Sequence, residues 1–231
     1  MSEQCVIVTG GSRGIGLATA MRFARRGAGV VITARDEAGL QAAAREIAAA
    51  GGECEAVAAD VTRAADAQRV VQAAEQRFGG VDVLVNNVGM APVRSIVEMS
   101  EEEYRQTLAA NLDAPFHMTR AAWAALSARR GVIVNVSSLA ALDPFPGFAV
   151  YGACKAWVST FTRVAADEGR KAGIRVFAIA PGAVETQMLR SAFPKIPADK
   201  CLAPDDVAAA IEGLCDERWT HSIGQTIAVR K

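Results

Sequence analysis

Short apolar runs alternate along this chain with segments whose apolar residues recur every three or four positions. The short runs are typical of buried strands, and the longer spacing is typical of helices that bury one side. Seven strands are therefore predicted, at residues 6–8, 30–33, 55–58, 81–85, 132–136, 176–179 and 226–229. Strands that alternate with helices over the whole length indicate a sheet covered on both faces. We predict an α/β protein with a doubly wound, Rossmann-type, mostly parallel sheet of seven strands.

The same pattern bears on domain organisation. No linker, internal repeat or low-complexity tract interrupts residues 1–231, so we expect a single domain. Residues 187–203 include Pro194 and Pro197 and show no clean period. We interpret this stretch as a short substrate lid.

Charge and cysteine content exclude several classes of function. Lys plus Arg and Asp plus Glu both number 25, so there is no electrostatic reason to expect nucleic acid or an anionic membrane as a partner. No apolar run reaches the roughly 18 residues of a membrane span, and no export signal precedes the first strand. We therefore expect a cytoplasmic protein. The five cysteines form no C-x-x-C pair and there are only two histidines, so neither a disulfide framework nor a metal site is predicted.

A glycine-rich turn follows the first predicted strand and precedes a helix-compatible run. Such a turn lets the backbone approach a pyrophosphate, and the helix N-terminus supplies free N–H groups. A tight turn without a ligand is the alternative, but the position after the first strand of an alternating chain favours a dinucleotide site. The candidate binding residues here are Gly10, Ser12, Arg13, Gly14, Ile15 and Gly16.

The end of the second strand carries a signal for the type of cofactor. An acidic residue there would bind the ribose 2′-hydroxyl of NAD. This chain has Arg35 instead, whose guanidinium suits a 2′-phosphate, and Arg13 could reach the same group. Asp36 is interpreted as a helix N-cap. We predict NADP(H) as the cofactor; the alternative for Arg35 is a solvated loop arginine.

Tyr151 and Lys155 are four residues apart, so they share one face of a predicted helix. A tyrosine hydroxyl has an ordinary pKa of about 10, and a neighbouring ammonium lowers it by favouring the phenolate. Ser138 follows a buried strand, and strand C-termini line the ligand crevice of an open α/β sheet. We predict that Tyr151 is the catalytic acid/base, although the spacing alone also fits an ordinary exposed pair.

Several motifs together resemble the short-chain dehydrogenase/reductase family, and the likeness is greatest to its 3-oxoacyl-[acyl-carrier-protein] reductase-like members. They occur in the family's order over about residues 5–229. The motifs are T-G-x-x-x-G-x-G at 9–16, Asp60-Val61, Asn86-Asn87-Val88-Gly89, Ser138 with Tyr151 and Lys155, and P-G-x-V-x-T at 181–186.

The resemblance implies residue roles. Tyr151 would exchange a proton with the substrate oxygen, and Ser138 would hydrogen-bond that oxygen. Lys155 would bind the nicotinamide ribose and lower the pKa of Tyr151. Beside the glycine turn, Tyr151 and Lys155, the implied cofactor-binding residues are Arg35, Asp60, Val61, Asn87, Gly89, Pro181, Gly182, Val184 and Thr186.

Asn111 matches the family's fourth catalytic residue, whose main-chain carbonyl holds a water in a proton relay to the lysine. The local sequence supports this independently. A capping box at 100–103 starts a helix, and Asn111 lies well inside it with Pro115 four residues further on. Because proline has no N–H, it leaves the Asn111 carbonyl free to accept from water. A proline that merely kinks the helix is the alternative.

We expect an NADP(H)-dependent oxidoreductase that transfers a hydride between nicotinamide and a carbonyl or alcohol substrate. Phe145, Phe148 and Phe193 predict apolar walls, hence a small to medium ketone, aldehyde or 3-oxoacyl compound. The alternative is a non-catalytic NADP(H)-binding regulatory protein, against which the intact catalytic set argues. A sugar-nucleotide epimerase is disfavoured, because too few residues follow Gly182 for a substrate domain.

The resemblance also implies a homodimer or homotetramer. Only Arg230 and Lys231 follow the last predicted strand, which leaves the family's contacts at this end open. Basic pairs at 129–130 and 170–171 could receive an acidic acyl carrier protein. Cations near helix C-termini more often complement the helix dipole.

Overall fold

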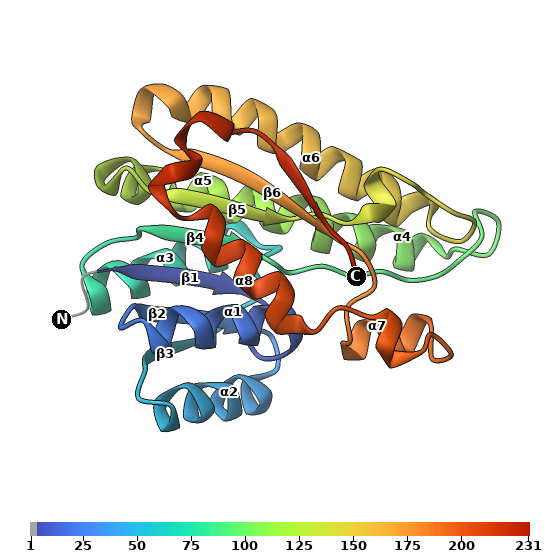
Figure 1. The fold of residues 1–231 in the computed structure, drawn as a ribbon, viewed down its shortest axis with the longest axis horizontal. Coiled ribbons are helices and arrows are strands. Elements are labelled where there is room, and N and C mark those ends of the chain that lie inside the picture. The colour runs from blue at the N-terminus through green and yellow to red at the C-terminus, as the bar shows by residue number, and fades with distance from the viewer. Residues whose placement is uncertain (1–3) are drawn as a thin grey trace.

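The computed structural model describes residues 4–231. Its strands form one sheet in the order β3-β2-β1-β4-β5-β6-β7, and every pairing is parallel (Figure 1). The strands are β1 (Cys5–Thr9), β2 (Gly29–Ala34), β3 (Glu53–Ala58), β4 (Val83–Asn86), β5 (Val132–Val136), β6 (Arg175–Pro181) and β7 (Thr226–Val229). The predicted doubly wound fold and all seven predicted strands are confirmed.

Helices cover both faces of the sheet. They are α1 (Gly14–Arg25), α2 (Glu37–Ala49), α3 (Ala64–Phe78), α4 (Glu101–Leu108), α5 (Ala114–Arg129), α6 (Ala149–Gly169), α7 (Gln187–Ala192) and α8 (Pro204–Leu214). Residues of α1, α2 and α8 pack on one face, and residues of α3, α5 and α6 pack on the other. Burial on both faces explains why the strands appear in the sequence as continuous apolar runs.

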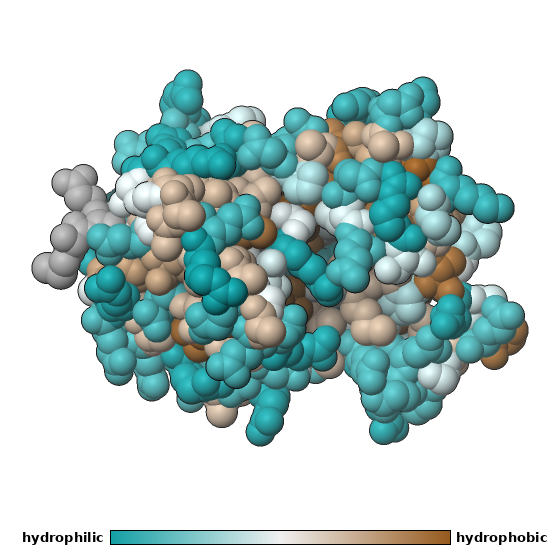
Figure 2. Space-filling view, turned by 90° about the horizontal axis from the view of Figure 1, so that it is seen from below, coloured by the Kyte–Doolittle hydropathy of each residue, from teal (hydrophilic) through white to brown (hydrophobic). Residues whose placement is uncertain are grey.

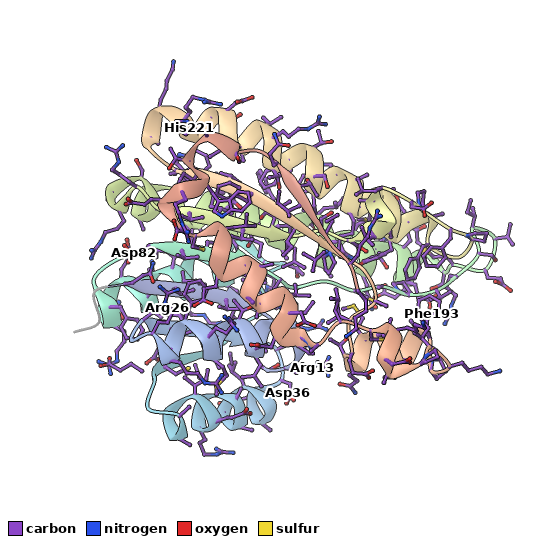
Figure 3. All side chains as sticks on the ribbon, in the orientation of Figure 1. Arg13, Arg26, Asp36, Asp82, Phe193 and His221 are labelled. Carbon is purple, nitrogen blue, oxygen red and sulfur yellow. The ribbon has the colours of Figure 1, made fainter. Side chains whose placement is uncertain are left out.

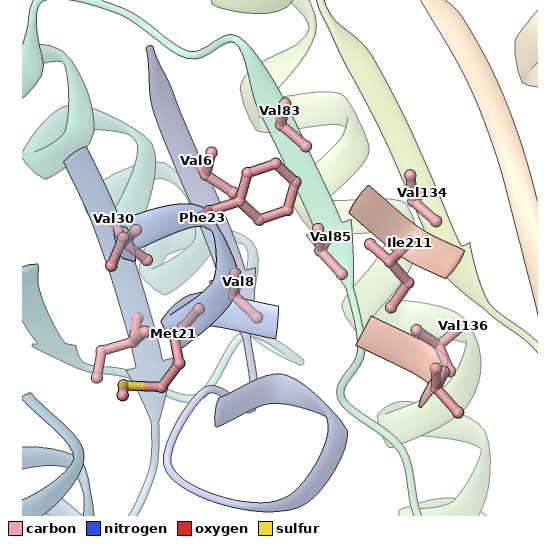
Figure 4. Close-up of a cluster of buried hydrophobic side chains, with 14 of the residues drawn as sticks. Val6, Val8, Met21, Phe23, Val30, Val83, Val85, Val134, Val136 and Ile211 are labelled. Atoms are coloured by element: carbon pink, nitrogen blue, oxygen red, sulfur yellow. The ribbon is translucent and has the colours of Figure 1, made fainter. Parts of the chain in front are cut away.

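Two apolar clusters hold these layers together, one on each face of the sheet. In β1, Val6 and Val8 belong to one cluster and Cys5 and Ile7 to the other, because successive side chains of a strand point to opposite faces. Figure 4 shows the first cluster, where Phe23 of α1 lies over the strands. The two clusters therefore make the sheet a rigid support for the loops that follow the strands.

Local capping signals also appear where the sequence places them. Ser100 accepts a hydrogen bond from the Glu103 N–H at 3.1 Å, and Glu103 accepts one from the Ser100 N–H at 3.2 Å, which starts α4. Asp36 accepts from the Gly39 N–H at 3.3 Å and caps α2. The predicted capping box and the predicted N-cap are both confirmed.

The strand order creates a crevice. The chain winds in opposite directions from β1 and β4, so the loops after these two neighbours diverge at the carboxyl edge of the sheet. Seen from below, the surface is hollowed between the part built on α1 and α2 and the lobe that includes α7 (Figure 2). Among the described residues, no helix combines the length and the apolar character needed to cross a membrane.

Candidate active site

The site residues predicted from the sequence gather at one edge of the sheet. Helical segments contribute Asn111, Tyr151 and Lys155, and the glycine turn runs into the first three residues of α1, Gly14 to Gly16. The other residues follow the carboxyl ends of neighbouring parallel strands: the glycine turn after β1, Arg35 after β2, Asp60 and Val61 after β3, Asn87 and Gly89 after β4, Ser138 after β5, and 181–186 at the end of β6. This is the edge at which open α/β sheets bind ligands.

The turn between β1 and α1 forms a tight cradle of backbone. Gly10 and Gly14 have φ of +66° and +57°, in the left-handed region that favours glycine. A Cβ on Gly16 would lie 2.2 Å from the carbonyl oxygen of Gly10. A Cβ on Gly14 would lie 3.3 Å from the methyl group of Thr186, so the start of α1 faces the segment after β6. The cradle fits a pyrophosphate at a helix N-terminus.

Thr9 and Asn87 hold this cradle in place. The Asn87 side-chain amide donates to the carbonyls of Thr9 at 2.9 Å and Gly10 at 3.2 Å. The Thr9 hydroxyl accepts from the N–H groups of Asn87 at 2.9 Å and Val88 at 3.1 Å. Asn87 was expected to contact the cofactor, but its amide nitrogen supports the glycine turn. Thr9 opens the glycine motif and was given no role from the sequence.

Two arginines stand at the β1–β2 side of the crevice. Arg35 is exposed directly after β2. Arg13 is the N-cap of α1, and its guanidinium donates to the side-chain oxygen of Gln187 at the start of α7. Figure 3 labels Arg13 and Asp36 close together in projection beside the ends of these strands. Arg13 thus links the glycine turn to the segment predicted as a lid.

Several predicted cofactor residues have part of their side chain engaged within the protein. One carboxylate oxygen of Asp60 accepts from the Thr62 N–H at 3.2 Å and hydroxyl at 2.8 Å. The side chains of Val61 and Val184 are 3% and 5% exposed and pack in the core, so either could offer a ligand little beyond its backbone. The Thr186 hydroxyl accepts from the Leu189 N–H at 3.2 Å and caps α7.

Ser138, Tyr151 and Lys155 are brought together where α6 begins beside the end of β5. The Lys155 ammonium donates to the carbonyl oxygen of Val136 at 2.8 Å and lies 5.7 Å from the centroid of the Tyr151 ring. The Ser138 hydroxyl accepts from the Ala140 N–H at 3.1 Å, and its interaction with the Tyr151 phenol acts to lower the pKa of that phenol. Tyr151 and Lys155 are only 9% and 4% exposed, so this chemistry is shielded from bulk water.

Burial dominates the titration of both groups. It raises the pKa of Tyr151, and the interaction with Ser138 opposes that rise. The sequence predicted a lowered pKa for Tyr151; in this structure the direction is opposite, because loss of water around the phenolate outweighs its neighbours. Burial lowers the pKa of Lys155 to about 8. Lys155 makes no ion pair with a carboxylate of the described residues, and the opposing effect of Cys154 on the Lys155 pKa is smaller than that of burial.

Asn111 lies in a π-helical turn (Ala109–Asp113) that separates α4 from α5. Asn111 does lie inside the helical stretch that the capping box starts, as predicted, but the backbone around it is π-helical, which the sequence did not indicate. The Asn111 amide nitrogen donates to the carbonyls of Met90 at 2.8 Å and Thr107 at 2.9 Å. Its side-chain oxygen is buried and has no partner among the described residues. π turns of this kind occur frequently at functional sites.

Gly89 leaves open the space between Asn111 and Lys155. A Cβ at this position would lie 3.0 Å from the side-chain oxygen of Asn111 and 3.4 Å from the ammonium nitrogen of Lys155. The orphaned amide oxygen and the desolvated ammonium therefore border one small polar space. A nicotinamide ribose or an ordered water, both of which donate and accept hydrogen bonds, fits polar groups of this kind.

Two further residues position α6 and were not identified from the sequence. The Ser137 hydroxyl donates to the Lys155 carbonyl oxygen at 2.9 Å. A Cβ on Gly152 would lie 2.9 Å from the Ala140 carbonyl oxygen, so glycine permits α6 to approach the turn after Ser138. Ser137 could have been identified from its position next to Ser138. Nothing in the residue spacing indicated a role for Gly152.

Aromatic rings gather next to Tyr151. The Phe148 ring lies 4.9 Å from that of Tyr151 in an edge-to-face arrangement, and the Phe193 ring lies 5.5 Å from Phe148. Phe145 lies 4.6 Å from Phe148 and 5.9 Å from Phe193. Phe193 directly follows α7 (Figure 3) and comes from the segment predicted as a lid. The apolar residues singled out in the sequence thus lie together beside the candidate acid/base.

The basic pairs lie at helix ends. Arg129 donates to the Gly79 carbonyl oxygen at 3.0 Å, and Arg170 pairs with Asp167 at 3.3 Å. The Arg129 contact is that of a cation with a helix C-terminus, because Gly79 caps α3, whereas the Arg170 contact is an ion pair within the last turn of α6. Within residues 4–231, no group of three or more His, Cys, Asp or Glu side chains is arranged to hold a metal ion.

Comparison with known proteins agrees with this geometry. A family model for short chain dehydrogenases matches residues 4–197. The 3β-hydroxysteroid dehydrogenase 1 of Eggerthella lenta is 38% identical over 99% of this chain and 93% of its own. The 3-oxoacyl-[acyl-carrier-protein] reductase FabG of Vibrio cholerae is 34% identical over 99% of this chain and 96% of its own.

Solved structures show the same architecture. A 3-ketoacyl-(acyl-carrier-protein) reductase from Brucella melitensis, solved in complex with NADH, is similar with a TM-score of 0.90 at 35% identity, over 99% of this chain and 97% of the other. Family match, relatives and fold agree over nearly the whole sequence. The chain belongs to the short-chain dehydrogenase/reductase family of nicotinamide-dependent oxidoreductases.

Proposed function

We propose that this oxidoreductase interconverts small to medium apolar carbonyl compounds and their alcohols with NADP(H), using Tyr151 as the acid/base. The observation that carries the proposal is the cluster of half-buried Ser138 with the buried Tyr151 and Lys155, next to the rings of Phe148 and Phe193. A proton donor, a second hydroxyl and an apolar wall meet there at the carboxyl edge of the sheet. This combination suits a polarised oxygen on an otherwise apolar substrate.

The residues then have distinct tasks. The bound nicotinamide supplies or accepts the hydride. Tyr151 transfers the phenol proton to the substrate oxygen during reduction and removes it during oxidation. Ser138 donates a hydrogen bond to the same oxygen and orients it. Lys155, held by the Val136 carbonyl, places a positive charge near the Tyr151 ring and stabilises the phenolate left by proton transfer.

The return of the phenol proton to Tyr151 is proposed to run through the polar space beside Gly89. The orphaned side-chain oxygen of Asn111 and the Lys155 ammonium border it, and Pro115 offers no N–H to the Asn111 carbonyl. A water held there would accept a proton from Lys155 or return one to it. Asn111 is thus proposed to support the proton relay rather than to contact the substrate.

The glycine cradle, Gly89 and the 181–186 segment support binding of a dinucleotide. The choice of NADP(H) over NAD(H) rests on Arg35, which directly follows β2, and on Arg13 at the start of α1. Of the two acidic residues that follow Arg35, Asp36 caps α2 and Glu37 lies in the first turn of that helix. The reductase from Brucella melitensis was solved with NADH, so both cofactors belong in the test.

The segment 187–203 is proposed to act as a substrate lid on a single domain, and the chain is proposed to assemble as a homodimer or homotetramer. The names of the relatives define two substrate classes worth testing, 3-oxoacyl compounds and 3-hydroxysteroids. Both present a carbonyl or hydroxyl group on an apolar body, as the aromatic wall requires.

Steady-state oxidation of NADPH and NADH with a panel of alkyl ketones, aldehydes, 3-oxoacyl thioesters and 3-oxosteroids tests the proposal. It predicts reduction of at least one apolar class, with NADPH preferred. Tight NADPH binding without turnover on any class would contradict it and favour the non-catalytic, cofactor-binding alternative.

A further inference from the structure

One guanidinium fastens the proposed lid to the end of the sheet. Arg190 of α7 donates through Nε to a carboxylate oxygen of Glu185 at 2.6 Å and through Nη2 to the other oxygen. Its Nη1 donates to the carbonyl oxygens of Ile196 at 2.5 Å and Pro194 at 3.4 Å. All three nitrogens of Arg190 are therefore engaged within the protein. Two of these nitrogens face Glu185, and the third faces the backbone of the lid itself.

Glu185, the partner of Arg190 in this contact, is held by backbone hydrogen bonds to a buried segment. The Glu185 N–H donates to the Leu202 carbonyl oxygen at 2.9 Å, and the Leu202 N–H donates to the Ala183 carbonyl oxygen at 2.9 Å. Leu202 is 5% exposed and belongs to the apolar cluster beneath the sheet. Glu185 is thus tied to the core, whereas Arg190 is tied to the lid.

Two other contacts tie the lid to the rest of the domain, the Arg13 hydrogen bond to Gln187 and the packing of Phe193 on Phe148. Helix α7 has six residues and none of them is buried, and a helix this short is not stable by itself. The Glu185 and Arg190 side chains are 40% and 31% exposed, so a single ion pair there would contribute little. The bidentate geometry and the two carbonyl contacts make this link stronger than an isolated surface pair.

The carbonyls that Arg190 binds directly follow Phe193. The Phe193 N–H donates to the Leu189 carbonyl oxygen at 2.6 Å, and its ring packs edge-to-face on Phe148, which in turn packs on Tyr151. Arg190 thereby constrains the backbone on which the aromatic wall depends. If the contact between Arg190 and Glu185 is lost, we expect the Phe193 ring to move away from Phe148.

We propose that Arg190, anchored by Glu185, is a positioning residue that holds Phe193 against Phe148 and so sets the affinity for the larger apolar substrates. The inference rests on the proposed function, because it treats the aromatic cluster as the substrate wall. A long alkyl chain contacts the Phe193 ring, and a short one does not. Removal of the link therefore weakens binding of long substrates and leaves cofactor binding and the chemical step unchanged.

The test compares Arg190→Met, Phe193→Ala and the double variant with Arg170→Met, a control that removes a surface pair with Asp167 remote from the lid. Amide hydrogen exchange is measured over residues 187–200. Dissociation constants of 2-butanol and 2-octanol are measured in the presence of NADPH, where no hydride transfer is possible. The chemical step is followed as kcat for 2-butanone.

For Arg190→Met, exchange in the lid rises, and the 2-octanol to 2-butanol affinity ratio falls about four- to fifteenfold, as expected when one or two methylene groups lose their contact. Phe193→Ala lowers the same ratio, and the double variant lowers it no further, because both changes remove one wall. In Arg190→Met, the NADPH dissociation constant and kcat for 2-butanone stay within about twofold of wild type. Arg190→Lys, which lacks the planar fork, resembles Arg190→Met.

Unchanged lid exchange in Arg190→Met would overturn the positioning role. Raised exchange with an unchanged alcohol ratio, or additive losses in the double variant, would overturn the assignment of Phe193 as the wall. A wild-type protein that reduces no ketone contradicts the proposed function instead, and the exchange and alcohol measurements still decide the role of Arg190.

Discussion

The ammonium nitrogen of Lys155 lies 5.7 Å from the centre of the Tyr151 ring, and it is held there by the carbonyl oxygen of Val136 rather than by a carboxylate. The site therefore buries a positive charge with only a neutral acceptor and an aromatic ring for compensation. Such an arrangement lowers the stability of the folded protein at neutral pH, whereas in the proposed mechanism the same charge serves to stabilise the phenolate that proton transfer leaves. This trade-off between activity and stability can be measured.

Replacement of Lys155 by methionine is expected to stabilise the protein at neutral pH. The pKa of Lys155 is about 8 in the fold against 10.5 for an ordinary lysine, so the unfolded chain binds this proton more tightly. Stability of the wild type therefore rises as pH increases from about 8 to 10.5, and below pH 8 the charged side chain lowers it by up to roughly 3 kcal/mol. Lys155→Met should show a higher free energy of unfolding in urea at pH 7, by about 1–3 kcal/mol.

The advantage of Lys155→Met should shrink as pH is raised towards 10.5, because the wild-type side chain then loses its charge. Lys171→Met, at an exposed position, is the control and should change stability by less than about 0.5 kcal/mol. A Lys155→Met protein less stable than wild type at pH 7 would show that the charge is compensated within the fold.

NADPH should bind more tightly than NADH. A charge-assisted contact to the 2′-phosphate contributes about 1.5–3 kcal/mol when well formed, which corresponds to roughly 10–150-fold, and the exposure of Arg35 favours the lower end. Arg35→Gln should reduce the preference to within a few fold, whereas Arg45→Gln on the exposed side of α2 should not. Fluorescence titration of both cofactors gives the ratio. Equal dissociation constants in the wild type would contradict this account of the arginines.

Pro115→Ala is expected to lower turnover more than cofactor affinity. Alanine restores an N–H four residues after Asn111, so a regular helix could bind the Asn111 carbonyl, to which Pro115 offers no donor. One lost hydrogen bond in the relay predicts a fall in kcat of about two- to tenfold. Pro204→Ala, at the first position of α8, is the matched control. Unchanged turnover in a folded Pro115→Ala protein would show that the free carbonyl is not used.

Affinity should rise along a homologous series of 2-ketones until the pocket is full. Phe145, Phe148 and Phe193 provide apolar surface, and each buried methylene contributes about 0.8 kcal/mol, or about fourfold in kcat/KM. Charged keto acids and sugars of similar size should be poor substrates, because Arg190 is already paired with Glu185. A clear preference for either polar class would mean that the proposed lid does not form the wall of this site.

The sheet could be predicted because burial on both faces imposes an apolar run on every strand, and the glycine turn because its conformations exclude side chains. The motif residues could be placed at one edge because parallel strands share that edge. The sequence did not reveal that Asn87 supports the glycine turn, or that Arg190 binds the lid's own carbonyls. Those roles depend on side-chain directions and on contacts between distant segments, which no periodicity encodes.

The direction of the Tyr151 pKa shift also could not be predicted from the sequence. Its spacing from Lys155 predicted a lowered value, and the direction in the fold depends instead on how completely the ring is buried. The π turn at Asn111 likewise depends on the packing of α4 and α5 around it. Residue type and spacing identify which groups meet; the surrounding packing decides their charge state and their orientation.

The central claim is that Tyr151 transfers the proton, and the most direct test is Tyr151→Phe assayed with the best substrate of the panel. The variant removes one oxygen atom and keeps the ring that packs on Phe148. We expect it to fold and to bind NADPH within about twofold of wild type, and to lose at least about 100-fold in kcat, the usual scale for a general acid. Near-wild-type turnover with normal cofactor binding would show that the proton comes from another group and would contradict the proposed mechanism.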